Sequence, residues 1–221
     1  MRVNVKYHRG RGDMKKYSQD TTLMNQHKNY DRVAKVFDFF RKGDMRRWGD
    51  VQKNHFRQMR GKVLHIGVGT GMEIINFPPG LDITGIDLSA KMLERALWRA
   101  KQYQGKIRFC LMNAESLAFP DDTFDTVATV CVFCTVVHPV AGLKECKRVL
   151  KPDGKLLLFE HVISKNLIYG LSLRFMSLFT NALEGTHLDR DTVENVRKAG
   201  FNIKSEKNVY LDIVKTIEGV K

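Results

Sequence analysis

Three glycines at alternating positions follow a short apolar run in the sequence VLHIGVGTGMEI, residues 63–74. Glycines at this spacing let the backbone approach a ligand, and their N–H groups together with a following helix N-terminus suit a polar cofactor. Asp87 ends the next apolar run, twenty residues after Gly67. A carboxylate at that place can accept two hydrogen bonds from a ribose diol. Gly67, Gly69, Gly71 and Asp87 therefore predict a nucleoside-binding site.

Met72 stands where the dinucleotide-binding fingerprint G-x-G-x-x-G has its third glycine. A bulky residue there hinders the close approach of a pyrophosphate to the backbone. A nicotinamide-dependent oxidoreductase is therefore disfavoured, although the loop still suits another nucleoside.

The elements that must position these residues alternate regularly from residue 62 onward. Apolar runs typical of buried strands lie at 62–67, 82–87, 106–112, 126–132 and 155–161. Helix-like segments lie at 70–76, 89–103, 139–150 and 189–200, with a turn sequence KPDG at 151–154. This alternation predicts βαβ units and a mostly parallel sheet covered by helices on both faces. Two last runs, at 201–210 and 212–220, are expected to close the sheet as a hairpin.

The net charge of +13 is concentrated at the N-terminal end of the 221 residues. Residues 1–62 hold 17 Lys and Arg against six Asp, a net of +11, whereas residues 63–221 have a net of +2. This asymmetry indicates a polyanionic partner, either nucleic acid or an anionic lipid surface, with solvated surface charge as the plain alternative. Residues 1–20 are expected to be flexible, and apolar spacing predicts two amphipathic helices that are separated near Gly43.

Composition places the chain among globular proteins, with 43% hydrophobic and 28% charged residues. No apolar stretch is long enough for a spanning helix, and the first thirty residues lack the apolar core of a secretory signal. The four cysteines, Cys110, Cys131, Cys134 and Cys146, are too scattered for a disulfide scaffold. Cys131 and Cys134 lack a second pair at zinc spacing, so we expect a reduced, cytoplasmic protein without a metal site.

Four ordered motifs resemble those of class I S-adenosylmethionine-dependent methyltransferases. They are the glycine loop, GIDLS at 85–89, NAESLAFPDDTFDTVATVCVFC at 113–134 and RVLKPDGKLLLFEH at 148–161. The sequence is similar to the branch with the bacterial quinone C-methyltransferases and the soluble-type phosphatidylethanolamine N-methyltransferases. The resemblance implies a Rossmann-like α/β fold with a mostly parallel seven-stranded sheet. It also implies a methyltransferase domain at 62–221 after a basic amphipathic helical extension at 1–61.

The resemblance further implies S-adenosyl-L-methionine as the cofactor and gives residues their roles. Gly67, Val68, Gly69, Thr70 and Gly71 would pass under its methionine part. Asp87 would hold the ribose hydroxyls, and Leu88 would pack on the adenine. Asn113 and Ala114 match the position that meets the adenine amino group, and Cys131 would face the methionine end.

Two residues depart from the family pattern. His65 stands where the family usually has Asp or Glu; a neutral imidazole is expected to hold the glycine loop by a hydrogen bond without adding negative charge near the sulfonium. Asn113 replaces the usual Asp, and its amide oxygen is expected to accept from the adenine amine, more weakly than a carboxylate would. Cofactor binding is expected to persist, with a catalytically lapsed cofactor-binding protein as an alternative.

Methyl transfer from a sulfonium is an in-line displacement, for which an enzyme positions both partners and, with an amine, accepts a proton. Open α/β sheets bind ligands at the carboxyl ends of their strands. The candidate catalytic residues are therefore His161 and His138, with Tyr30 from the N-terminal helix that the family folds over the cofactor. A structural role for His161 and helix capping by His138 are the competing interpretations.

A lipophilic acceptor fits most of the remaining features. The N-terminal segment combines aromatic residues and Met with Lys and Arg, and IYGLSLRFMSLF at 168–179 is expected to form a lid or groove for an acyl or prenyl chain, or to pack in the core. The expected reaction is N-methylation of a phospholipid amine such as phosphatidylethanolamine. Quinone C-methylation and S-methylation of a small thiol are alternatives.

Nucleic acid is disfavoured as the acceptor because CVFC stands where enzymes that methylate exocyclic amines have Asp/Asn-Pro-Pro-aromatic. We expect a cytoplasmic monomer, with residues 1–60 contacting the anionic inner surface of the membrane peripherally.

Overall fold

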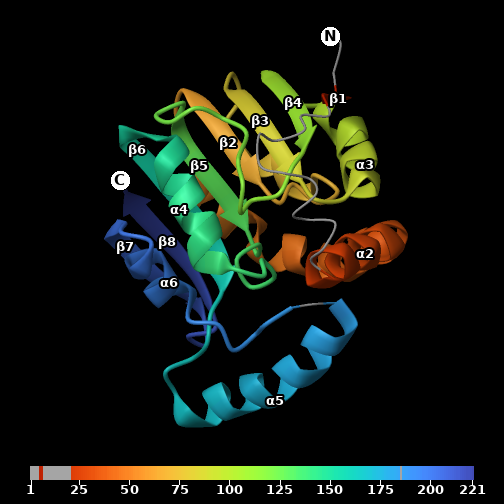
Figure 1. Ribbon diagram of the computed structural model, residues 1–221, viewed down its shortest axis with the longest axis vertical. Coiled ribbons are helices and arrows are strands. Elements are labelled where there is room, and N and C mark those ends of the chain that lie inside the picture. The colour runs from red at the N-terminus through yellow and green to blue at the C-terminus, as the bar shows by residue number, and fades with distance from the viewer. Residues whose placement is uncertain (1–4, 7–20, 185) are drawn as a thin grey trace.

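The apolar runs form the centre of a mixed sheet in the computed structural model, which describes residues 5–6, 21–184 and 186–221 (Figure 1). The strands are β1 (Val5–Lys6), β2 (Lys62–Ile66), β3 (Asp82–Asp87), β4 (Lys106–Leu111), β5 (Phe124–Val130), β6 (Leu150–His161), β7 (Asn202–Tyr210) and β8 (Val214–Val220). Their order across the sheet is β1-β4-β3-β2-β5-β6-β8-β7. All pairs from β1 to β6 are parallel, and β8 is antiparallel to both β6 and β7.

This order confirms the Rossmann-like fold and the C-terminal hairpin of the sequence analysis. The seven strands β2 to β8 form the expected sheet, and the two-residue β1 adds an edge through Val5 and Lys6. The predicted flexibility of residues 1–20 falls largely outside the described residues. The proposed division between residues 61 and 62 stays a prediction.

Helices cover both faces of the sheet. They are α2 (Thr21–Phe56), the 3₁₀ helix η1 (Met72–Asn76), α3 (Ala90–Ala100), α4 (Pro139–Val149), α5 (Leu167–Glu184) and α6 (Thr192–Lys198). One apolar core joins the sheet to α4 and α6, and a second joins the opposite face to α2 and α3. Figure 1 shows α4 and α6 in front of the sheet, with α2 and α5 beyond its lower edge.

The N-terminal helix corrects the prediction of two helices separated near Gly43, because α2 is one continuous helix of 36 residues. Gly43 is solvent-exposed, and no atom lies near the position of an added Cβ. An exposed glycine within a helix costs only about 1 kcal/mol. Contacts on both sides of Gly43 outweigh that cost, since Ala34 and Phe56 are both buried.

Candidate functional site

The glycine loop leaves β2 at the carboxyl edge of the parallel strands. Gly67, Gly69 and Gly71 have φ angles of 66°, 55° and 77°, in the left-handed region that favours glycine. A Cβ on Gly67 would also lie 2.4 Å from a methyl carbon of Val132, in the loop after β5. The loop therefore needs glycine both for its conformation and for its close contact with the next strand end.

Asp87 at the end of β3 ties this loop to the start of α3. Its Oδ2 accepts a hydrogen bond from the Gly69 N–H at 2.7 Å, and its Oδ1 accepts from the Ser89 N–H at 2.9 Å. Burial raises the pKa of Asp87, and the same two N–H groups counteract that rise. Each carboxylate oxygen has a second lone pair, so the geometry also suits a ligand with two hydroxyl donors.

α2 holds the glycine loop from the other side, through the buried carboxylate of Asp38. Asp38 accepts from the Thr70 hydroxyl at 2.5 Å, from Arg95 at 2.9 Å and from Arg99 at 2.7 Å. Arg99 also donates to the Thr70 carbonyl oxygen at 2.7 Å. Burial pushes the pKa of Asp38 up, but these hydrogen bonds outweigh it and hold the pKa below its ordinary value. A charged network thus joins α2 and α3 to the loop.

Two further contacts place α2 over the edge of the sheet. The Ser89 hydroxyl donates to Asp31 at 2.5 Å, one residue after Tyr30 in α2. The buried Asn76 amide donates to Gln52 at 3.0 Å. The helix therefore brings Tyr30 to the carboxyl end of β3, and its place beside the cofactor stays a prediction.

We expect Thr70→Val to loosen this attachment. The substitution keeps the side-chain volume but leaves the buried Asp38 without its hydroxyl donor, which should lower the free energy of unfolding by about 2 kcal/mol. Because the loop would lose its link to α2, the affinity for the cofactor should fall about tenfold. Chemical denaturation and titration calorimetry measure the two effects.

Thr70→Ser is the matched control, since it keeps the hydroxyl and removes only a methyl group. It should bind cofactor within a factor of three of the natural protein. If Thr70→Val and Thr70→Ser bound the cofactor equally well, the hydroxyl contact with Asp38 would have no part in ordering the loop.

The loop after β5 contributes the third part of the site. Cys131 has a φ of 52°, which ends the strand two residues before the predicted end at residue 132. Its N–H donates to the Phe159 carbonyl oxygen at 2.8 Å. Glu160, fully buried near the end of β6, accepts at Oε1 from the Thr129 hydroxyl at 2.8 Å and from the Val132 N–H at 2.9 Å.

Residues from the C-terminal segment hold the outer side of the same loop. Arg190 donates to the carbonyl oxygens of Phe133 and Val136, and the His187 N–H donates to that of Cys134 at 2.8 Å. Burial and the nearby Arg190 lower the pKa of His187. The chain thus anchors this loop from two elements, β6 and the segment between α5 and α6.

Asn113 and its neighbours extend the site after β4. The Asn113 Oδ1 already accepts from the Glu115 N–H at 2.9 Å, while its buried Nδ2 has no hydrogen-bond partner among the described residues. Because the Asn113 Oδ1 has a second lone pair, it can still accept from the adenine amine, and the buried Nδ2 offers a donor as well. A ring nitrogen of adenine is the matching acceptor. Ala114 is buried in the core and Leu88 is half-buried.

His65 corrects an expectation of the sequence analysis. It is buried in β2, and neither ring nitrogen has a hydrogen-bond partner among the residues that the structure describes. Its ring packs edge-on against Phe77, with centroids 4.9 Å apart. Burial lowers the pKa of His65 to about 3, so the imidazole is neutral. It does not hold the glycine loop by a hydrogen bond and instead fills the core beneath it.

The candidate catalytic histidines lie on neighbouring strand ends. His161 is the last residue of β6, and its carbonyl oxygen accepts from Thr192 at 3.4 Å. His138 is exposed at the N-cap of α4, where its side chain makes no capping bond. Its N–H instead donates to Glu115 at 2.9 Å, which joins the loops after β4 and β5. The side chain of His138 is therefore available to solvent at this edge.

The sequence analysis missed the residues that hold the site together. Asp38 follows Asp31 by seven positions, a spacing that puts both carboxylates on one face of a helix. Glu160 interrupts the apolar strand sequence LLLFEH, which is a signal for a buried charge. Arg190 carries no comparable signal, because it lies in a polar connecting segment.

The side chains at this edge of the sheet suit an organic cofactor better than a metal ion. The four cysteines are free, and the described residues contain no cluster of three His, Cys, Asp or Glu side chains that could hold a metal ion. The loops instead offer backbone N–H groups, one carboxylate and one amide donor. This set fits a nucleoside with a diol and a purine.

Comparison with known proteins gives three kinds of agreement. Residues 64–158 match the family model described as a methyltransferase domain. A phosphatidylethanolamine N-methyltransferase from Cereibacter sphaeroides is 31% identical over 137 residues, which cover 61% of this chain and 67% of the relative. A ubiquinone/menaquinone biosynthesis C-methyltransferase from Geotalea daltonii is 32% identical over 142 residues, covering 59% and 60%.

A solved structure agrees with the fold over most of its length. The S-adenosylmethionine-dependent methyltransferase of Thermotoga maritima, described as a possible histamine N-methyltransferase, superposes with a TM-score of 0.65 at 21% identity. The superposition covers 87% of this chain and 98% of that one. The chain spans about 60% of the length of the quinone methyltransferase from Geotalea daltonii.

Proposed function

Since the chain belongs to the class I S-adenosylmethionine-dependent methyltransferases, we propose that it transfers a methyl group to a lipophilic acceptor, with a phospholipid amine such as phosphatidylethanolamine as the first choice. The observation that carries the cofactor part is the link between Asp87 and the glycine loop. The relative from Cereibacter sphaeroides, a phosphatidylethanolamine N-methyltransferase, supports the choice of acceptor.

The residues of this chain then bind and orient the two partners. S-adenosylmethionine supplies a methyl group that is activated by a sulfonium. Gly67 to Gly71 would line its methionine part, Asp87 would accept from its ribose hydroxyls, and the Asn113 amide would donate to its adenine. Cys131 would face the methionine end, because Glu160 fixes the loop that carries it.

Proton acceptance from an amine is assigned to the carboxyl edge of the sheet. His161, His138 and Tyr30 are the proposed residues, with His161 first because it ends the strand that carries Glu160. A neutral imidazole takes up a proton near neutral pH, which suits an amine that loses one on methylation.

To reach a lipid acceptor the enzyme must approach a membrane surface. We assign this role to the basic N-terminal segment. Arg46, Arg47 and Lys53 are exposed on α2, and each basic residue near an anionic surface contributes about 1 kcal/mol. None of the described helices is both apolar enough and long enough to cross a bilayer. Contact with the membrane would therefore be peripheral.

The decisive experiment incubates the full chain with methyl-labelled cofactor and a total lipid extract, then separates the products by chromatography. Label in a mono- or dimethylated phosphatidylethanolamine supports the proposal. Label in a quinone instead would assign the reaction of the relative from Geotalea daltonii, a C-methyltransferase. Titration calorimetry gives the control: absence of heat at saturating S-adenosylmethionine would remove the cofactor assignment itself.

A further inference from the structure

α5 exposes several large apolar side chains to which the proposed methyl transfer gives no role. Six of the ten exposed large hydrophobic side chains among the described residues lie in its first three turns. They are Leu167, Ile168, Tyr169, Leu171, Phe175 and Met176, with exposed fractions from 42% to 76%. Contiguous exposed apolar surface of this kind marks a contact with a partner or a membrane.

The orientation of the helix explains why these side chains are exposed. Gly170, Leu173 and Ser177 are buried and lie on one stripe of α5, at spacings of three and four residues. The Ser177 hydroxyl donates to Asp189 at 2.6 Å on that side. With 3.6 residues per turn, Ile168 and Leu171 fall on the opposite side. α5 therefore presents its apolar side to the outside and a small, partly polar stripe to the protein.

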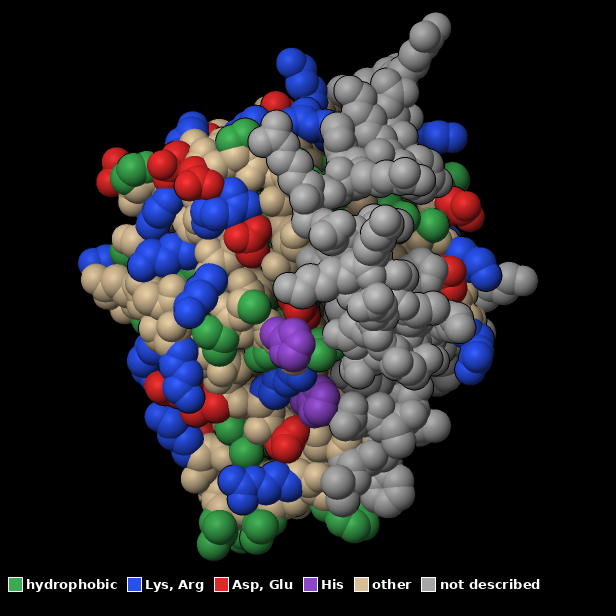
Figure 2. All heavy atoms as spheres, in the orientation of Figure 1, with side chains coloured by type: hydrophobic (Ala, Val, Ile, Leu, Met, Phe, Trp, Pro, Cys, Tyr) green, Lys and Arg blue, Asp and Glu red, His purple; other side chains and the backbone are tan. Residues whose placement is uncertain are grey.

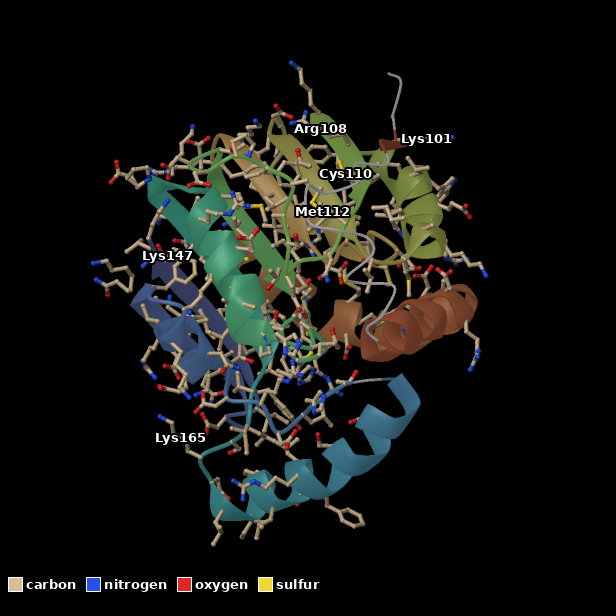
Figure 3. All side chains as sticks on the ribbon, in the orientation of Figure 1. Lys101, Arg108, Cys110, Met112, Lys147 and Lys165 are labelled. Carbon is tan, nitrogen blue, oxygen red and sulfur yellow. The ribbon has the colours of Figure 1, made fainter. Side chains whose placement is uncertain are left out.

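The charged side chains along the exposed first turns of this segment, residues 163–177, are both basic. Between residues 163 and 183 the only charged side chains are Lys165 and Arg174, and both are exposed. Asp212, whose carboxylate accepts from the Lys165 N–H, is paired with Lys215 at 2.8 Å. Figure 3 places Lys165 just before α5, and Figure 2 shows apolar side chains gathered at the lower edge of the molecule, below Lys and Arg.

We propose that the outward side of α5, defined by Ile168, Leu171 and Phe175, lies in the headgroup region of an anionic phospholipid bilayer. An apolar helix face with exposed cations beside it has the chemistry of such an interfacial helix. A second copy of this chain is a poorer partner, because each copy carries a net charge of +13. This inference rests on the proposed function, since a lipid acceptor requires the enzyme to approach a bilayer.

The position of α5 explains how its contact with a bilayer would serve the candidate site. α5 follows β6 after five residues, so it starts at the carboxyl edge where the candidate site lies, and it contacts α2 (Figure 1). Docking through its outward side would orient that edge toward the lipid. The cationic segment on α2 would add a long-range attraction that salt weakens, whereas the apolar contact of α5 would persist at high salt.

The test compares the full chain with the double variant Ile168→Ser/Leu171→Ser in vesicle flotation. Vesicles of phosphatidylcholine with phosphatidylglycerol are used at low salt and at 0.5 M salt, about where exposed charges are largely screened. We expect the variant to bind these vesicles at least tenfold more weakly at high salt. The matched control, Trp98→Ser/Leu211→Ser, removes two exposed apolar side chains elsewhere and should bind as the natural protein does.

Three readouts keep the inference separate from the proposed function. Cofactor affinity should be unchanged in the double variant, which shows that it folds. Equal flotation of the variant and the natural protein would overturn the inference. So would a dimer that the variant dissociates while vesicle binding stays the same. A protein that binds vesicles through α5 but methylates no lipid would keep this inference and overturn the proposed acceptor.

Discussion

Asp87→Asn is expected to raise the Kd for S-adenosylmethionine by two to three orders of magnitude. The substitution keeps one carbonyl oxygen but turns the other acceptor into an amide donor, which would face the N–H of Gly69 or Ser89. Each hydrogen bond to a charged group contributes about 1.5–3 kcal/mol, and loss of the loop contact adds to the loss of the ribose contact. A combined loss of about 3–4 kcal/mol corresponds to the stated change in Kd.

Titration calorimetry measures this affinity directly, without requiring the acceptor to be known. Asp82→Asn is the matched control, because Asp82 starts the same strand at the opposite edge and forms a partly exposed ion pair with Arg108 at 2.9 Å. The control should bind the cofactor as tightly as the natural protein. Binding by Asp87→Asn within threefold of the natural protein would rule out both roles assigned to this carboxylate.

The central parallel strands could be predicted because both of their faces are covered and their sequences are therefore continuous apolar runs. β3 begins and ends at the predicted residues, and β2 differs by one residue. The segment 151–154 shows the limit of this reasoning. Its KPDG sequence is typical of a turn, yet it lies within β6, where the register with β5 shifts between Phe124 and Thr126. The residues that favour a turn therefore make the first part of β6 irregular and do not end the strand.

The glycine loop and Asp87 could be predicted because their roles depend on local backbone geometry. Asp38 and Arg190 could not, because their partners lie 32 to 61 positions away in the chain. The donor that Asn113 offers has the same cause: only the fold shows that its amide nitrogen is buried without a hydrogen-bond partner among the described residues. The exposed side of α5 was unpredictable because apolar residues surround the helix, so periodicity alone gives no outward face.

The pH dependence of stability should contain a contribution from Glu160 with an unusual sign. Burial raises the pKa of this carboxyl from 4.5 to about 7, although N–H groups of Val132 and Phe133 and the Thr129 hydroxyl oppose the rise. Between those two values the folded chain holds a proton that the unfolded chain releases. The free energy of unfolding should therefore fall as pH rises from 4.5 to 7, by about 3 kcal/mol in all.

His55 and His65 contribute in the opposite direction, which is why a single pH curve would hide the effect. Burial lowers their pKa values to about 4 and about 3, so they destabilise the fold as pH falls below 6.5. Glu160→Gln removes only the carboxyl. The contribution of the two histidines is the same in natural protein and variant, so it cancels in the difference between their free energies of unfolding. Between pH 4.5 and 7 this difference should change by about 1.4 kcal/mol per pH unit, the value for one bound proton.

Denaturant unfolding at half-unit pH steps measures this difference, with Glu94→Gln on the exposed side of α3 as the control. A flat difference curve for Glu160→Gln would mean that burial does not raise the pKa of Glu160. A slope of the expected size would mean that the order of the candidate site depends on pH. Above pH 7 the ionised Glu160 carboxylate accepts more strongly from the N–H groups of Val132 and Phe133. The loop that carries Cys131 is then held more firmly, so cofactor affinity should rise with pH as Glu160 ionises.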